Sequence, residues 1–160
     1  MKGTSRAASY TPTMSRREWL LILAALKGPA GGLDPVRVQK GLFLLAMEGD
    51  VPVEERYEFE PYNYGPMSRD VYRDLGELGA DGLIERVEVA GQSWPRFRAT
   101  EHGRELAQQL VNEADPHTRA AARKLYEIKQ DIVRKSFADL LNDVYDRYPR
   151  YAEKSVFQQT

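Results

Sequence analysis

The stretch YEFEPYNYGPMSRDVYRDLGEL, residues 57–78, contains the change of hydrophobic period that decides the fold. Its first residues alternate aromatic side chains with glutamate, which predicts a short strand over residues 57–62. The dipeptide Gly65-Pro66 follows and predicts a turn, because glycine supplies a positive φ and proline fixes the next φ. A strand and a sharp corner are therefore expected before the next helix.

The second half of the stretch has the period of an amphipathic helix. Val71, Leu75 and Leu78 recur at helical spacing and are expected to face a core, and Ser68 precedes them as an N-cap. Asp81-Gly82 ends the pattern. One short stretch thus combines a strand, a corner and a helix, which indicates an α+β fold.

Two helices are expected upstream of this stretch. Ser15 with Glu18 forms a capping-box pattern that begins a helix ending near residue 27. Asp34-Pro35 places a cap and a proline at the start of a second helix, which runs to about residue 48.

A hairpin and a fourth helix are expected downstream. Residues 83–89 and 94–99 read as two strands around the turn 90–93. Thr100 then caps a helix that ends near residue 112.

The chain after Pro116 is helical in pattern, but its apolar residues form two stripes on different faces. Either the helix breaks near Ser136 and both stripes pack on one core, or one helix serves two partners. We predict the second arrangement, a homodimer, with the second stripe at its interface: Val133, Phe137, Leu140, Val144 and Tyr148.

The predicted order of helix, helix, strand, helix, hairpin and helix is that of a winged helix-turn-helix domain. The expected organisation is a disordered basic arm over 1–14, a winged-helix domain over 15–113 and a C-terminal helical extension over 114–160. The fold class is α+β.

Two segments resemble known families. VQKGLFLLAMEG (38–49), together with FEPYNYGPMSRDVYRDLGELGADGLIE (59–85), resembles the YwgA-like proteins and the Panacea (SocA-like) antitoxin domains. Those proteins share a Gln-Lys helix, an aromatic strand and a Tyr-Gly-Pro corner. FRATEHGRELAQQL (97–110) is similar to the wing-to-helix segment of MarR/PadR-like regulators. The resemblance implies a winged-helix regulator or adaptor and does not imply an enzyme.

Composition argues against catalysis. The sequence has no cysteine, so it forms no disulfide, thiol nucleophile or cysteine zinc site. Its two histidines, His102 and His117, have no metal-ligand spacing, and no nucleotide-binding or hydrolase motif is present. We expect no enzyme activity, metal or cofactor. The longest apolar run, 19–26, is too short to span a bilayer, so a cytoplasmic protein without a membrane partner is expected.

The charge is distributed unevenly, although the formal net charge is only −1. The two ends of the chain are basic and the middle is acidic, which is unlike the basic face of strong DNA binders. The winged-helix order nevertheless favours a prokaryotic regulator that binds double-stranded DNA. The basic arm, with Lys2, Arg6, Arg16 and Arg17, is expected to add phosphate contacts.

The residues predicted to contact DNA lie on the third helix and the wing. Arg69 and Arg73 lie opposite Val71 on the third helix, although Asp70 and Glu77 are placed to pair with Arg73. The alternative is a protein-binding adaptor or antitoxin-like module, with a peptide groove lined by tyrosines. The predicted DNA contacts are Arg69, Tyr72, Arg73, Gln92, Trp94, Arg96 and Arg98, and the alternative groove comprises Tyr57, Tyr62 and Tyr64.

Overall fold

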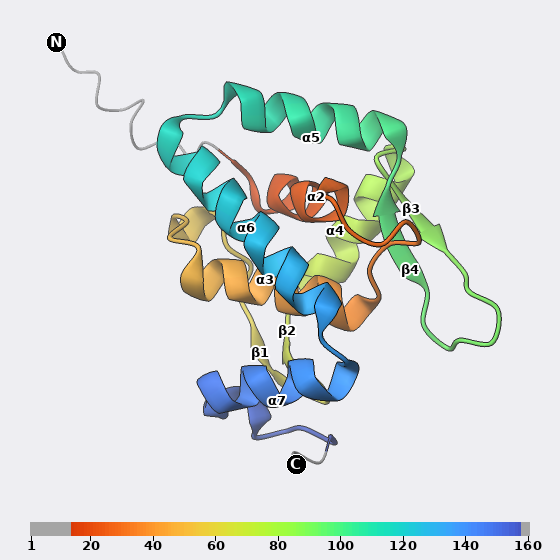
Figure 1. Cartoon of the computed structure of the whole chain (residues 1–160), viewed down its shortest axis with the longest axis vertical. Coiled ribbons are helices and arrows are strands. Elements are labelled where there is room, and N and C mark those ends of the chain that lie inside the picture. Colours follow the sequence, from red (N-terminus) through yellow and green to blue (C-terminus); the bar gives the residue numbers. More distant parts are fainter. Residues whose placement is uncertain (1–13, 158–160) are drawn as a thin grey trace, which may run out of the picture.

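The computed structural model describes residues 14–157 and has a helix-rich α+β architecture with two small antiparallel sheets (Figure 1). Each sheet has two strands, β1 with β2 and β3 with β4. The elements, in chain order, are α2 (Arg16–Ala25), α3 (Pro35–Glu48), η1 (Val53–Glu55), β1 (Glu60–Tyr62), β2 (Gly65–Met67), α4 (Arg69–Ala80), β3 (Ile84–Val87), β4 (Arg96–Ala99), α5 (Glu101–Glu113), α6 (Pro116–Arg134), α7 (Phe137–Arg147) and η2 (Pro149–Ala152).

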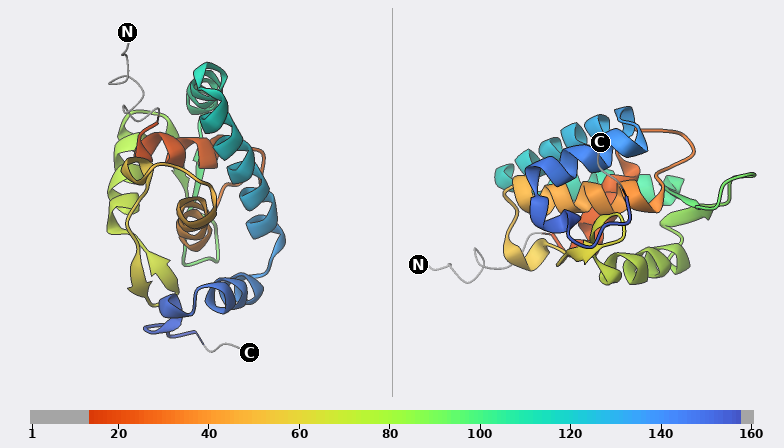
Figure 2. Two further views of the ribbon diagram at one scale, coloured as in Figure 1. Left: turned by 90° about the vertical axis from the view of Figure 1, so that its left-hand side faces the viewer. Right: turned by 90° about the horizontal axis from the view of Figure 1, so that it is seen from below.

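Helix α3 is the centre of the molecule. Its residues from Val38 to Leu45 are buried on every side of the helix, because α2, α6 and β2 all pack against it. Figure 1 shows α6 crossing in front of α3, and Figure 2 shows α2 and α6 lying around it. A helix that is apolar over most of its circumference has to be enclosed in this way.

The hairpin of β3 and β4 is fixed at its base and extends from the body of the molecule at its tip (Figures 1 and 2). Leu33 and Phe97 exchange two backbone hydrogen bonds of 2.8 Å, which attach β4 to the loop before α3. Thr100 caps α5 by accepting from Gly103 N, and its hydroxyl donates to Gly82 O at 2.7 Å. The predicted hairpin is present, with shorter strands than the pattern suggested.

The predicted corner of residues 57–66 differs in the structure. The strand begins only at Glu60, because Tyr57 is buried in the core and its hydroxyl donates to Asp74 at 2.6 Å. Gly65-Pro66 is not the turn but part of β2, paired with Tyr62 and Pro61. The turn is therefore at residues 63–64. Gly65 has a φ of +93°, and a Cβ there would lie 3.1 Å from Tyr145.

The C-terminal segment is two helices. Helix α6 ends at Arg134, and Ser136 caps α7 by accepting from Asp139 N at 3.1 Å. The guanidinium of Arg37 on α3 donates to Ile132 O at 3.1 Å and to Lys135 O at 2.7 Å, which satisfies the carbonyls at the end of α6. Of the two arrangements expected from the sequence, the break near Ser136 is the one observed.

The N-terminal arm predicted for residues 1–14 lies outside the described residues, apart from Met14. Met14 is buried, and its backbone N–H is 3.4 Å from a carboxylate oxygen of Glu55. Within residues 14–157, none of the helices has both the length and the apolar character that a membrane crossing needs.

Candidate functional site

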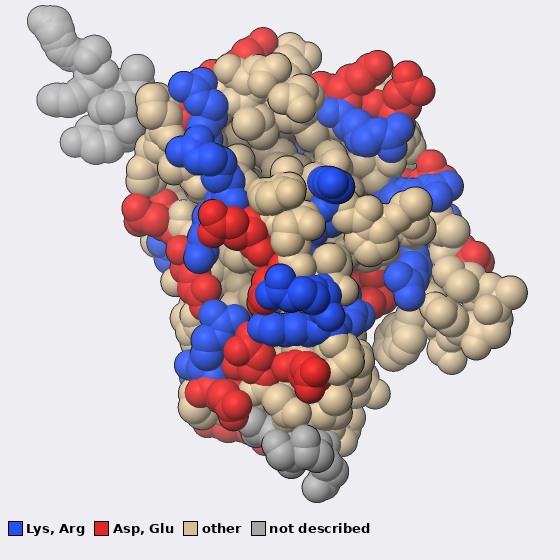
Figure 3. Space-filling model, viewed as in Figure 1, with Lys and Arg blue, Asp and Glu red and all other residues tan. Residues whose placement is uncertain are grey.

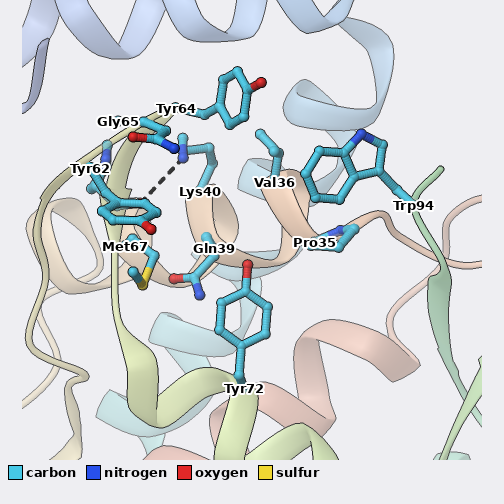
Figure 4. Close-up of a pocket in the computed structure, with 12 residues that line it drawn as sticks. Pro35, Val36, Gln39, Lys40, Tyr62, Tyr64, Gly65, Met67, Tyr72 and Trp94 are labelled. Carbon is cyan, nitrogen blue, oxygen red and sulfur yellow. Dashed lines mark hydrogen bonds between the residues drawn. The ribbon is translucent and has the colours of Figure 1, made fainter. Parts of the chain in front are cut away.

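A pocket of about 290 Å³ lies where α3, the β1–β2 hairpin, α4 and the loop leading into β4 meet (Figure 4). Its walls are mostly apolar and aromatic, which is typical of sites that bind ligands or short segments. The lining residues are Pro35, Val36, Gln39, Lys40, Tyr62, Asn63, Tyr64, Gly65, Pro66, Met67, Tyr72 and Trp94.

Gln39 forms the floor of the pocket and joins two of its elements. Its side-chain amide donates to Ser68 O and accepts from Ser68 N, both at 2.9 Å. Both groups are buried, so this pair holds the start of α4 against α3. Ser68 lies at the N-cap of α4 as predicted, but its side chain makes no cap hydrogen bond, and the Val71 N–H donates instead to Ser68 O at 3.3 Å.

Lys40 follows Gln39 and is 2% exposed. Its ammonium donates to Pro66 O at 3.2 Å, the dashed line in Figure 4. Burial lowers the pKa of Lys40 from 10.5 to about 7, and the negative charge of Asp34 opposes that shift. A Cβ at Gly65 would lie 3.3 Å from the Lys40 side chain, so the glycine leaves room for the amine.

Aromatic side chains form the open walls. Tyr62, Tyr72 and Trp94 are 44%, 46% and 50% exposed. Tyr64 is half-buried and meets Trp94 edge to face, with ring centroids 6.3 Å apart. These rings come from the β1–β2 hairpin, α4 and the segment before β4, so only the tertiary structure brings them together (Figure 4). Such rings are amphipathic and remain available to contact a partner.

The aromatic residues predicted for two different sites are grouped differently in the structure. Tyr72 and Trp94 were predicted to contact DNA, and both line this pocket. Tyr57 was predicted to line a peptide groove, but it is buried against Asp74 and outside the pocket lining. Tyr62 and Tyr64, the other two tyrosines of that predicted groove, line the pocket.

The arginines of α4 lie among carboxylates. Arg69 is exposed, and Arg73 pairs with Asp70 at 3.2 Å and with Asp74 at 3.4 Å. The two arginines predicted for phosphate contact on α2 also pair with α4, Arg16 with Asp70 and Arg17 with Glu77. Helix α4 carries two arginines and three carboxylates, so the surface formed with α2 is a network of opposite charges.

The hairpin arginines are also engaged. Arg98 donates to Glu85 at 3.0 Å and to Ala30 O at 3.2 Å, and Arg96 lies 3.5 Å from Gly32 O. They share one face of β4, as the strand period predicted, while Phe97 is buried on the other. Gln92 is exposed in the hairpin turn. The face over α5, α6 and α7 likewise mixes basic and acidic residues without a continuous basic area (Figure 3).

The stripe predicted for the dimer interface is divided by burial. Leu140 and Val144 are 0% exposed and belong to the chain's own core, so a second copy has no access to them. Val133 is half-buried, and Tyr148 is half-buried and donates to Glu48. Phe137 is 37% exposed and stacks edge to face on Tyr64. The reason is the helix break, which lets both stripes pack within one chain.

No group of histidine, cysteine, aspartate and glutamate side chains in residues 14–157 has the arrangement of a metal site. No protein-family model matches the sequence, and no curated protein is significantly similar to it. The function is therefore inferred from the geometry of the pocket. Gln39 and Lys40 were not predicted as site residues, yet the Gln-Lys pair and the Tyr-Gly-Pro corner, which carried the family resemblance, all line the pocket.

Proposed function

We propose that this protein is a protein-binding module of the winged-helix type, whose aromatic pocket captures a segment of a partner chain. The order of α2, α3, α4, the β3–β4 hairpin and α5 supports the winged-helix assignment. The main support for the proposed function is the pocket. Tyr62, Tyr72 and Trp94 expose nearly half of their surface around one cavity, and aromatic anchors are enriched at protein interfaces.

The charge on α4 also favours a protein partner over DNA. Exposed ion pairs are individually weak, about 0–1 kcal/mol each, and phosphates could displace them. The carboxylates of Asp70 and Glu77 would however remain beside any phosphate bound by Arg69 or Arg73 and would repel it. A surface with nearly balanced charge suits a protein better.

A screen for short peptides tests the proposal. Pools of random hexapeptides, one with free C-termini and one with amidated C-termini, would be passed over the immobilised protein, and retained peptides would be titrated individually. Tyr72→Ala and Trp94→Ala should each weaken binding at least tenfold. Tyr126→Ala is the matched control, because Tyr126 is 41% exposed on α6 and outside the pocket. Retention of no peptide from either pool, or equal binding by Trp94→Ala, would contradict the function.

DNA binding is the second candidate, favoured by the exposure of Arg69 and Arg73 on α4. Fluorescence anisotropy with a random 30-base-pair duplex at low salt tests it. A regulator would bind, and Arg69→Ala with Arg73→Ala would reduce the slope of log affinity against log salt by about 2. A protein-binding module should show no measurable affinity for the duplex.

A further inference from the structure

Lys40 gives the pocket a positive charge. Among the described residues that line it, Lys40 is the one cation and none is acidic. The remaining walls are apolar, aromatic or amide groups. A buried ammonium without a carboxylate in the same pocket is costly unless an anion compensates it.

The hydrogen bonds of Lys40 are incomplete. A lysine ammonium has three donors, and within the described part of the chain Lys40 uses one, to Pro66 O at 3.2 Å. Asp34, whose charge favours protonation of Lys40, accepts from Arg37 at 2.7 Å and makes no ion pair with Lys40. Figure 4 shows the Lys40 amine on the side of the pocket formed by Tyr62 and Gly65. An anion in the pocket would supply the missing acceptors.

The size of the cavity restricts the occupant. About 290 Å³ lies at the lower end of pockets that hold small ligands, so it suits one or two residues rather than a long segment. The occupant must place an anion at Lys40 and an apolar group against rings such as Tyr72 and Trp94. A C-terminal residue has both in one unit, a free carboxylate and a side chain.

We propose that the pocket binds the C-terminus of a partner chain, with the terminal carboxylate accepting from Lys40 and the terminal side chain packed between the aromatic walls. The proposal rests on the protein-binding function and specifies its ligand. Capture of a terminal carboxylate is a recurrent mode of peptide recognition, and a charge-assisted hydrogen bond in a desolvated pocket is stronger than a neutral one.

The test compares N-acetyl-L-phenylalanine with N-acetyl-L-phenylalanine amide by NMR titration. The chain has two tryptophans, so the indole N–H of Trp94 reports the pocket, and that of Trp19, which is 1% exposed, serves as an internal control for the fold. A single residue should bind weakly, with a Kd on the order of 1 mM. We expect the acid to bind at least tenfold more tightly than the amide. In Lys40→Met, acid and amide should bind equally, at the affinity that the amide has for the unmodified protein.

Three results would overturn the proposal. Equal affinities of acid and amide for the unmodified protein would exclude the carboxylate anchor, while the peptide-binding function would stand if amidated peptides bind. A preference for the acid that persists in Lys40→Met, with the Trp19 resonance unchanged, would place the carboxylate elsewhere. Phenylacetate binding as tightly as the acetylated amino acid would assign the pocket to free small acids instead of a chain terminus. By contrast, if the unmodified protein retains no peptide from either pool of the screen, the proposed protein-binding function itself is contradicted.

Discussion

The side-chain amide of Gln39 closes two hydrogen bonds of 2.9 Å with the backbone N–H and C=O of Ser68, which lies 29 residues further along the chain. This pair fixes the start of α4 on the central helix and places Tyr72 at the edge of the pocket. The position of α4 beside the pocket thus depends on this buried amide.

Gln39→Leu tests that dependence. The substitution leaves the buried Ser68 N–H without a partner, while Ser68 O keeps only its 3.3 Å hydrogen bond from Val71 N; a buried group without a partner costs about 1–3 kcal/mol. We expect the free energy of unfolding in urea to fall by about 1–3 kcal/mol. Gln108→Leu is the control, because Gln108 is exposed on α5 and should change stability by less than about 0.5 kcal/mol. Similar stabilities for the two variants would contradict the role of Gln39.

Lys129→Met tests the junction between α6 and α2. The Lys129 amine donates to Leu23 O at 2.6 Å, to Ala24 O at 3.3 Å and also to Leu26 O, so it satisfies carbonyls at the C-terminal end of α2. Methionine fills a similar volume but donates nothing. We expect a loss of about 2 kcal/mol in urea unfolding.

The matched control for that variant is Lys124→Met on the same helix. Lys124 is half-buried, and in the described part of the chain it has no hydrogen bond or ion pair. Its replacement should change stability by less than about 0.5 kcal/mol. Equal losses for both substitutions would show that the carbonyl contacts of Lys129 are not what stabilises the junction.

Lys40 should make stability depend on pH. Its pKa is about 7 in the folded chain because of burial, and an unfolded lysine keeps a pKa near 10.5. Unfolding therefore takes up a proton between about pH 7 and 10, and stability rises with pH across that window. Lys129, with a pKa lowered to about 8 by burial, adds to the slope above pH 8.

The measurement is urea unfolding between pH 6.5 and 10 for the unmodified chain and Lys40→Met. Between about pH 7 and 8 the free energy of unfolding of the unmodified chain should rise by about 1 kcal/mol per pH unit, and that of the variant should rise much less. The slope of Lys124→Met should match that of the unmodified chain. A flat profile for the unmodified chain in this interval would show that Lys40 keeps an ordinary pKa when folded.

Leu140→Asp and Phe137→Asp distinguish the chain's own core from an exposed surface. Leu140 is fully buried, so a charge there should cost more than about 4 kcal/mol and unfold the chain. Phe137 is partly exposed, so Phe137→Asp should lower the free energy of unfolding by only about 1–2 kcal/mol, through loss of the ring contact with Tyr64. Circular dichroism gives the stability, and sedimentation equilibrium of Phe137→Asp shows whether a homodimer uses this edge. A folded Leu140→Asp would contradict the packing of α7.

Local sequence determined the helices and their ends. Ser15, Asp34 and Thr100 each accept from a backbone N–H three residues on, as the cap pattern predicts, because a cap acts within one turn. The period of Val71, Leu75 and Leu78 likewise identified the buried face of α4, since that face depends only on helical geometry. The coarse α+β class follows from such local patterns.

Tertiary structure decided what the side chains between those patterns do. Tyr57 continues an alternating aromatic pattern, but Asp74 from α4 binds its hydroxyl and takes it out of the strand. Arg37 from α3 reaches the end of α6 and fixes the break that the two apolar stripes left open. The pocket arises in the same way, because Lys40, Tyr62, Tyr72 and Trp94 come from separate elements and meet only when the chain packs around α3. Periodicity and capping act over a few residues, whereas a site depends on contacts between residues far apart in the sequence.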